Sequence, residues 1–346
     1  MEETNNVPKS VEVMRKISSK EFSNYFYKNI HPKVVGYERW RPAIYVLDTI
    51  LTVIAVILMV SRLFEIKNMD VMMVLLTILI VGLILKIVTP SMKKLQQQMK
   101  YETLPLLLNF IGSDFVIRDY GVNKTSGNPY ADRLKDVFTF RLYDENADFK
   151  NSEEKEYEHT RLFDYFNRCK IDDYITGKYN SLPILFRDIN LKRESGSGKN
   201  RTVTQIFKGL LVKFPMNKKF NGDIIVKRDV NVLINLGDSQ NRVHLEDPVF
   251  EKYFDVYADD QVEARYILTT GFMNRLVSIA SKNRNCSVSC SFIDGYMYLA
   301  LDGKDWFDIA PNKSFSDIGN WQRVLVDFVD VFRIIDELKV EQNIGM

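Results

Sequence analysis

Two long runs of uncharged residues limit what this chain can fold into. Residues 43–60 contain one charged residue, Asp48, and residues 71–88 contain one, Lys86. Each run is 18 residues long, close to the ~20 apolar residues with which a helix crosses a hydrocarbon core. Because a bilayer core accepts only structures that satisfy their own backbone hydrogen bonds, the two runs predict a transmembrane hairpin of two helices.

Basic residues on the flanks of the hairpin predict its orientation. The first run is preceded by four basic residues, Lys28, Lys33, Arg39 and Arg41, and the second is followed by three, Lys93, Lys94 and Lys100. In the loop 61–70, two basic residues, Arg62 and Lys67, are balanced by two acidic ones, Glu65 and Asp70. Positive charge stays on the cytoplasmic side, so both termini are expected in the cytoplasm. The lipid bilayer is therefore the first expected partner.

The two charges inside the runs are expected at one depth. Asp48 lies 13 residues before Ser61 and Lys86 lies 16 after Asp70, which places both roughly 20 to 24 Å from the outer loop at about 1.5 Å per residue. An ion pair between Asp48 and Lys86 would fix the hairpin. Alternatively, each side chain reaches the interface alone, as long side chains near helix ends often do.

The sequence predicts four regions. Residues 1–42 form a membrane-proximal amphipathic helix, 43–89 the hairpin, 90–180 a helical connecting region and 181–346 a cytoplasmic α+β domain. An aromatic face at helical spacing, formed by Phe22, Tyr25, Phe26 and Ile30, either lies on the bilayer or packs on the domain, and packing is the favoured interpretation.

The last region predicts the fold class. Short apolar runs separated by turn residues indicate strands, and Asp294-Gly295 between two of them is typical of a type I′ hairpin turn. Helices are predicted at 151–169, at 271–282 and at 321–339, the last with Asn320 as N-cap, whereas 265–268 is predicted as a strand. The chain is therefore expected to be α+β, with a curved antiparallel sheet and a long C-terminal helix.

Charge and motifs exclude several functions. With 47 basic and 45 acidic residues interspersed, no large positive field is available for nucleic acid. The loop Gly196 to Asn200 lacks the first glycine and the Ser or Thr of a phosphate-binding loop. The three histidines and the pair Cys286 and Cys290 show no metal-ligand spacing. No cofactor, metal site or catalytic set is predicted.

One polar cluster remains as a candidate site. It consists of Glu246, Asp247, Asp259, Asp260, Glu263 and Arg265. Clustered carboxylates can serve a hydrolase or bind a cation. Alternatively, Asp247 and Asp260 cap helices or turns and Arg265 pairs with Glu263, and this structural interpretation is favoured because it explains aspartate before proline.

Three segments carry a family resemblance. The runs Val243 to Tyr257 and Asp259 to Thr269 strongly resemble the signature of a bacterial family, domain of unknown function (DUF) 3137. The segment Phe207-Lys208-Gly209 to Asn221-Gly222 is similar to its second motif, and Asp173-Tyr174 with Gly177 to a third. The resemblance implies a hairpin-anchored protein of the bacterial inner membrane and supplies no catalytic residues.

These observations favour a membrane-anchored cytoplasmic interaction or scaffold module. Its expected partners are the bilayer and another membrane or cytoplasmic protein, or a second copy of the chain. The alternative is a membrane-tethered enzyme that uses the carboxylates of the polar cluster.

The intramembrane pair can be tested by charge reversal. Asp48→Lys and Lys86→Asp should each lower the yield of membrane-inserted protein, because each leaves two like charges near the same depth. The double exchange should restore the yield, measured by membrane fractionation. Losses that simply add in the double variant would show that the two residues do not meet.

Overall fold

The computed structural model describes residues 8–39, 41–42, 46, 49–50, 53–54, 96, 98–112, 116–117, 147–179, 182–228, 242–282, 287–309 and 313–338. Most of the two predicted spans, including Asp48 and Lys86, lies outside these ranges. Within them, no helix combines the length and the apolar character needed to cross a membrane.

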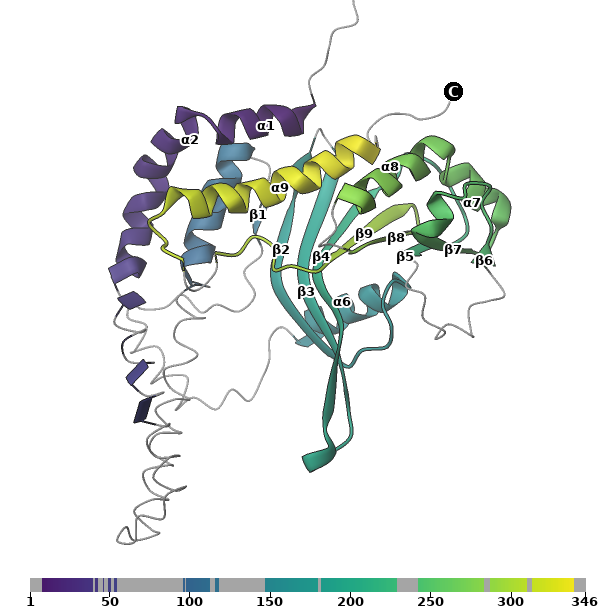
Figure 1. Cartoon of the computed structure of the whole chain (residues 1–346), viewed down its shortest axis with the longest axis horizontal. Helices are drawn as coiled ribbons and strands as arrows, with labels where there is room; N and C mark the ends of the chain where they lie inside the picture. The colour runs from purple at the N-terminus through teal and green to yellow at the C-terminus, as the bar shows by residue number, and fades with distance from the viewer. Residues whose placement is uncertain are drawn as a thin grey trace, which may run out of the picture.

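A nine-stranded sheet forms the centre of the molecule, in the order β1-β2-β3-β4-β9-β8-β5-β7-β6 (Figure 1). All neighbouring strands are antiparallel. The strands are β1 Val116–Ile117, β2 Arg168–Tyr179, β3 Leu182–Ser195, β4 Thr202–Pro215, β5 Ile224–Arg228, β6 Arg242–Val243, β7 Phe254–Ala258, β8 Ser287–Ile293 and β9 Tyr296–Asp302.

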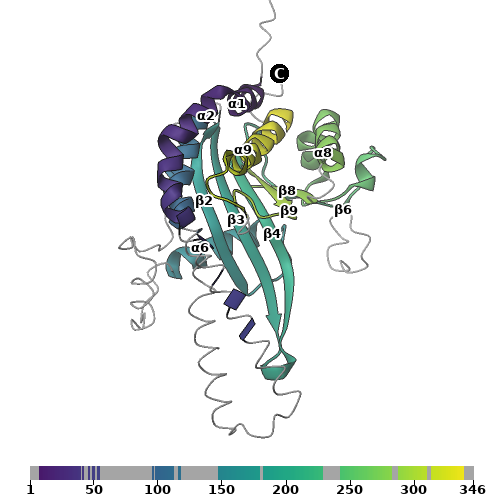
Figure 2. The same cartoon turned by 60° about the vertical axis from the view of Figure 1, so that its left-hand side comes forward.

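Helices cover both faces of this sheet (Figures 1 and 2). One face carries α9, α8 and the N-terminal helices, and the other carries α6. The helices are α1 Lys9–Ile17, α2 Lys20–Tyr25, the π-helix η1 Phe26–Ile30 continuing through 31–39, a helix over 98–111, α6 Ala147–His159, α7 Gln261–Ile267, α8 Thr270–Lys282 and α9 Ile318–Leu338, with short 3₁₀ turns η2 Gly198–Asn200 and η4 Phe250–Lys252.

Alternation along the strands produces two separate apolar cores. On β4, Leu210, Val212 and Phe214 face α9, whereas Leu211 faces α6. This is the period of two that a pleated strand imposes. The antiparallel sheet and C-terminal helix of the predicted α+β class are therefore confirmed.

The aromatic side chains of α9 hold it on the sheet. The ring of Phe328 stacks on that of Phe307 with centroids 4.0 Å apart, and Phe332 stacks on Tyr179 at 4.3 Å. The predicted N-cap of this helix is wrong. Asp317, not Asn320, accepts the early amide, from Gly319 at 2.9 Å, and Asn320 donates its side-chain amide to the carbonyl of Ser314.

The N-terminal helices belong to the same core as the sheet. Phe22, Phe26 and Ile30 are fully buried, and the rings of Phe22 and Tyr25 each lie 5.1 Å from that of Phe110 on the 98–111 helix. The Tyr25 hydroxyl donates to the carbonyl of Leu106 at 2.8 Å. The aromatic face predicted within 1–42 is thus packed on protein.

Three predicted boundaries differ from the structure. β1 and β2 lie within 90–180, so this region is not only a helical connection to a domain that starts at 181. The helix predicted at 151–169 ends at His159. Residues 265–267 of the strand predicted at 265–268 continue α7, because the Asp260 side chain accepts the amide of Val262 and starts a helix there.

Glycine is required at one turn position and one strand position. In the β8–β9 turn, Asp294 and Gly295 have φ values of 51° and 78°, as the predicted type I′ turn needs. At Gly209, where β4 meets β9, an added Cβ would lie 2.1 Å from the carbonyl oxygen of Leu301. The glycine of the Phe207-Lys208-Gly209 motif therefore permits the close approach of these strands.

The dependence of the fold on α9 can be measured at Phe328. Because this side chain is fully buried, Phe328→Ala should lower the free energy of unfolding by about 3 to 5 kcal/mol. Urea denaturation of the full chain in detergent measures the change. Arg333→Ala, at an exposed position of the same helix, is the matched control. Equal midpoints for the two variants would contradict this role of α9.

Candidate functional site

The predicted polar cluster lies at turns, where two of its carboxylates cap short helices. Asp247 Oδ1 accepts the amides of Val249 and Phe250 at 2.9 and 3.0 Å, at the start of η4. Asp260 Oδ1 accepts the amide of Val262 at 2.7 Å, at the start of α7. These are the contacts of N-caps.

Among the remaining members of the cluster, Glu263 and Asp259 connect two of the segments that resemble the DUF3137 family. Glu263 accepts the amides of Asn221 at 3.0 Å and Gly222 at 2.7 Å. Asp259 accepts the amide of Asp223. Arg265 donates to the carbonyl of His244 at 3.2 Å instead of pairing with Glu263 as predicted, and Glu246 is exposed. Four of the five carboxylates therefore accept backbone amides, and of these Asp259 and Glu263 lie together beside Gly222.

Other residues considered from the sequence are also apart. His159 contacts Asp294 and His244 lies beside Glu251, while Cys290 is buried. Cys286 lies outside the described residues. Among the residues that the structure describes, no three His, Cys, Asp or Glu side chains could together hold a metal ion.

A different set of charges is buried between the 98–111 helix and the sheet. The ammonium of Lys100 lies 2.5 Å from Asp173 Oδ2 on β2 and 2.6 Å from Asp308 Oδ1 after β9. The side chain of Lys100 is 16% exposed and that of Asp173 is 6% exposed, whereas that of Asp308 is 46% exposed. One cation thus joins three segments that are distant in the sequence.

A β-bulge places Asp173 on this face. Ile171 pairs with Ile189 and Asp173 pairs with Asp188, so Asp172 is an extra residue in β2. Ile171 packs in the core under α6, whereas Ile175 packs in the core under α9. Because the extra residue reverses the alternation, Asp173 faces α9 together with Asp188, its neighbour across the strands.

Asp188 holds the segment after β9. Its Oδ2 accepts the backbone amide of Trp306 at 3.1 Å. The next residue, Phe307, has a φ of 59°, in the left-handed region that costs a bulky residue about 1 to 3 kcal/mol. Its amide donates to Asp327 on α9 at 3.2 Å. Carboxylates of the sheet and of α9 therefore support an unfavourable backbone conformation.

Burial shifts the protonation of these groups. Burial raises the pKa of Asp173 to about 6, although Lys100 opposes the shift. Burial and the negative charge of Asp173 raise the pKa of Asp188 to about 8. For Lys100, burial lowers the pKa, but Asp173 and Asp308 outweigh it and the net direction is upward. Near neutral pH the site holds a charged ammonium and a protonated Asp188.

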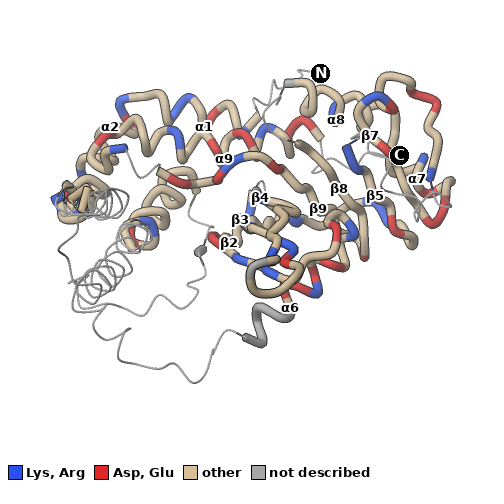
Figure 3. Tube along the Cα trace, turned by 60° about the horizontal axis from the view of Figure 1, so that its bottom comes forward, with Lys and Arg blue, Asp and Glu red and all other residues tan. Residues whose placement is uncertain are grey.

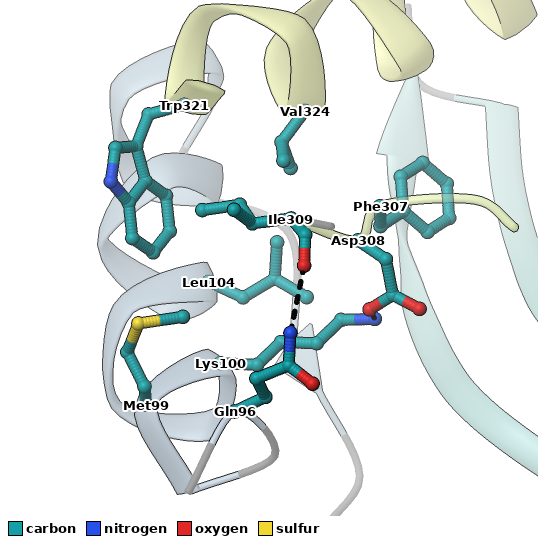
Figure 4. Close-up of a pocket in the computed structure, with 9 residues that line it drawn as sticks. All are labelled: Gln96, Met99, Lys100, Leu104, Phe307, Asp308, Ile309, Trp321 and Val324. Carbon is teal, nitrogen blue, oxygen red and sulfur yellow. Dashed lines mark hydrogen bonds and ion pairs between the residues drawn. The ribbon is translucent and has the colours of Figure 1, made fainter. Parts of the chain in front are cut away.

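A small recess, partly open to solvent, lies beside this site (Figure 4). Gln96 crosses it to donate its side-chain amide to the carbonyl of Ile309 at 3.0 Å. Lys100 and Asp308 line it, but Asp173 and Asp188 do not. The two carboxylates with raised pKa values are therefore closed off from the recess, and the arrangement fastens segments together. The residues that line the recess are Gln96, Met99, Lys100, Leu104, Phe307, Asp308, Ile309, Trp321 and Val324.

The opposite face of the sheet has its own buried cation. Arg187, next to Asp188 on β3, is 2% exposed, and its Nε lies 2.8 Å from Glu153 Oε2 on α6. It also contacts Glu156 and lies over the rings of Tyr157 and Tyr174 at 5.4 and 5.6 Å. Burial raises the pKa of Glu153. This cation fastens α6 to the sheet as Lys100 fastens the 98–111 helix.

The sequence contained a signal for these residues that its interpretation missed. Arg187 and Asp188 stand in the middle of an otherwise apolar strand, Leu185-Phe186-Arg187-Asp188-Ile189. Charged residues are almost never buried unless they are paired. Two adjacent charges there indicate ionic partners on both faces. No local pattern indicates Lys100 or Asp308 as those partners.

Comparisons with known proteins identify part of the chain. Residues 205–340 match the family described as protein of unknown function, DUF3137. No curated protein matches. A crystal structure of the mycobacterial trehalose monomycolate transport factor A, TtfA, is similar at 11% identity and a TM-score of 0.26, over 53% of this chain and 94% of that chain. A TM-score of this size supports no argument about fold or function.

The raised pKa of Asp188 predicts a specific pH dependence. The folded pKa of about 8 exceeds that of an unfolded aspartate, so the stability due to protonated Asp188 is complete below about pH 4 and is lost as the pH rises toward 8. Asp188→Asn imitates the protonated acid and removes this loss. Between pH 5 and pH 8, wild type should lose up to about 1.4 kcal/mol per pH unit relative to the variant.

Denaturant titrations at several pH values measure this difference. Asp173, Asp172 and Lys100 also act on Asp188 and are unchanged in the variant. Asp164→Asn, which removes an exposed carboxyl, is the control and should follow the wild-type pH profile. Parallel profiles for wild type and Asp188→Asn would show that Asp188 is ionised in the folded protein.

Proposed function

Residues 205–340 match the DUF3137 family, whose function is unknown, and from this premise we propose that the chain is a membrane-anchored interaction module. Residues 43–60 and 71–88 enter the bilayer, both termini lie in the cytoplasm, and the α+β domain binds a protein partner at the inner membrane surface. Anchoring and partner are parts of the proposal.

The packing of the flanking helices is the observation that carries this proposal. The helical segment through 31–39 leads into the first uncharged run, and the 98–111 helix follows the second. Phe315 donates its amide to Glu38 at 2.8 Å, and Lys100 is ion-paired with Asp173 and Asp308. The described helices that precede and follow the two runs are therefore each fastened to the domain.

Apolar exposure supports insertion of the first run. The described residues of this run include Val46, Ile50, Val53 and Ile54, which are 59%, 49%, 51% and 38% exposed. They recur at helical spacing, so they form one stripe of a helix. Such an exposed apolar stripe next to Arg39 and Arg41 fits acyl chains beside a basic interface.

The geometry of the domain favours binding over catalysis. The carboxylates of the predicted cluster bind backbone amides at turns, and those with raised pKa values are closed off from the recess. A catalytic group must reach its substrate. The alternative of a membrane-tethered enzyme therefore gains no support from these carboxylates, and the partner is proposed to be another protein or a second copy of the chain.

Fractionation and topology reporters test the proposal. The full chain should stay in the membrane pellet after carbonate extraction, and reporters fused at either terminus should behave as cytoplasmic. A variant with residues 43–88 replaced by a Gly/Ser linker should be released into the soluble fraction. Release of the full chain by carbonate would contradict anchoring, and a periplasm-active C-terminal fusion would contradict the orientation.

Crosslinking in intact membranes tests the binding function. Affinity capture of the crosslinked full chain should yield a defined partner or a crosslinked dimer of the chain. The Asp164→Asn variant should give the same product. A hydrolase activity of purified protein that Asp260→Asn removes without unfolding would instead support the enzyme.

A further inference from the structure

The connection between β9 and α9 is joined to the helix that leads into the first uncharged run. We call its described residues, 303–309 and 313–317, the strap. The strap runs from β9 toward the N-terminal helices (Figure 1). Glu38, on the helical segment through 31–39, accepts the backbone amide of Phe315 at 2.8 Å and the hydroxyl of Ser314 at 3.0 Å. One part of the strap is therefore fixed to the helix before the first run.

Another part of the strap is joined to the helix that follows the second run. Gln96 donates its side-chain amide to the carbonyl of Ile309 at 3.0 Å, and the ammonium of Lys100 donates to Asp308 at 2.6 Å. The recess is lined by this helix, by the strap and by α9 (Figure 4). Both helices next to the uncharged runs are thus joined to one short segment of the domain.

Carboxylates also tie the strap to α9 and to the sheet. Asp327 on α9 accepts the amide of Phe307 at 3.2 Å and pairs with Lys304 at 2.5 Å. Asp188 on β3 accepts the amide of Trp306 at 3.1 Å. The strap is therefore the junction of the two helices, α9 and the sheet. The unfavourable φ of 59° at Phe307 lowers the free energy needed to release it.

The centre of this junction holds more acidic than basic side chains. The ammonium of Lys100 interacts electrostatically with Asp173, Asp188 and Asp308. Asp173 and Asp188 are 6% and 3% exposed. With every carboxyl ionised, the four groups would carry a net charge of 1 − 3 = −2. Because buried charge without a counterion is unfavourable, the closed arrangement favours a proton on one buried carboxyl.

Neighbouring charges leave this acidic excess in place. Asp172 adds to the negative charge that acts on Asp188. Lys208 and Lys304, two described cations nearby, already have carboxylate partners at 2.6 and 2.5 Å, and on α9 the two signs are interspersed (Figure 3). The charged groups of the elements around Asp188 are Asp172 and Asp173 on β2, Lys208 on β4, Lys100 on the 98–111 helix, Lys304, Asp305 and Asp308 on the strap, and Asp327 on α9.

We propose that the strap is a proton-dependent latch for the two helices. While Asp188 holds a proton, the strap stays closed on the sheet. When that proton is lost, the strap and the 98–111 helix separate from the sheet, and water enters from the recess. This inference rests on the proposed anchoring for one point, that the two helices continue into a membrane hairpin. The latch makes the coupling between that hairpin and the domain depend on pH.

The direction of the pH effect follows from where the proton binds more tightly. Burial and the charge of Asp173 raise the pKa of Asp188 to about 8 in the closed arrangement, whereas an aspartate in water has a pKa of about 3.9. The closed arrangement is therefore favoured at low pH, and opening becomes easier as the pH rises toward 8. Burial raises the pKa of Asp173 to about 6, which acts in the same direction over a lower range.

Hydrogen exchange of the full chain in detergent measures the opening. Exchange rates of peptides from 98–111 and 303–309 are divided by the intrinsic chemical rate at each pH. The equilibrium constant for opening should then rise between pH 6 and pH 8, by up to about tenfold per pH unit for one proton. Peptides of α8, Thr270–Lys282, lie outside the junction and should show no rise. Junction peptides without a rise, or a rise shared by α8, would overturn the proposal.

Charge variants test whether Asp188 is the site of the proton. Asp188→Asn imitates the protonated acid, so the junction should stay closed at pH 8 and the rise should disappear. Asp164→Asn, which removes an exposed carboxyl outside the junction, should open like wild type. Asp173→Asn leaves two carboxyls beside Lys100 and should reduce the rise, which keeps the test decisive if Asp188→Asn does not fold. An unchanged rise in either junction variant would overturn the latch.

Anchoring is measured separately on the same protein. Vesicle flotation after carbonate treatment reports anchoring without reference to hydrogen exchange. A chain that does not float but opens as the pH rises overturns the anchoring and keeps the latch. A chain that floats and shows no pH-dependent opening overturns the latch alone.

Discussion

The burial of the Lys100 ammonium is the constraint on which the arrangement of the helical side of the molecule depends. An ammonium removed from water without a partner costs several kcal/mol, and this one is held by Asp173 from β2 and Asp308 from the segment after β9. Moving the 98–111 helix would leave both carboxylates without their cation. Through Asp308 this contact ties the 98–111 helix to the segment whose Phe307 stacks on α9 and lines the recess.

The central strand β3 carries ionic contacts on both of its faces. Arg187 and Asp188 are neighbours in the chain and point to opposite sides, toward α6 and toward α9. Replacing such buried ions with apolar residues can leave the free energy of unfolding unchanged. Their contribution is therefore better sought in selecting one arrangement of the helices on the sheet. Sliding α6 would separate Arg187 from Glu153, and sliding the 98–111 helix would separate Lys100 from Asp173, whereas an apolar face alone would tolerate sliding. The layers of this domain are thereby fixed relative to one another.

The sequence predicted elements whose signal is local and missed those that depend on partners. The apolar stripe of α9 and the Asp294-Gly295 turn are each indicated by residues close together in the sequence, and both are present in the structure. β2 was missed because Asp173 and Gly177 interrupt its alternating apolar positions Cys169, Ile171 and Ile175. α7 was taken for a strand because Arg265-Tyr266-Ile267 has a strand composition. Asp247 and Asp260 are visible as caps, but Lys100 meets Asp173 only through the tertiary fold.

The extra residue in β2 also shows where the length of this strand can vary. Ile171 and Asp173 pair with Ile189 and Asp188, which are consecutive residues of β3 and point to opposite faces. A strand without Asp172 would therefore form the same two pairs in a regular ladder, with Ile171 still toward α6 and Asp173 still toward α9. One residue added or removed elsewhere in β2 would instead exchange the two faces over the rest of the strand. Asp172 is thus a position at which a change of length by one residue leaves both cores intact.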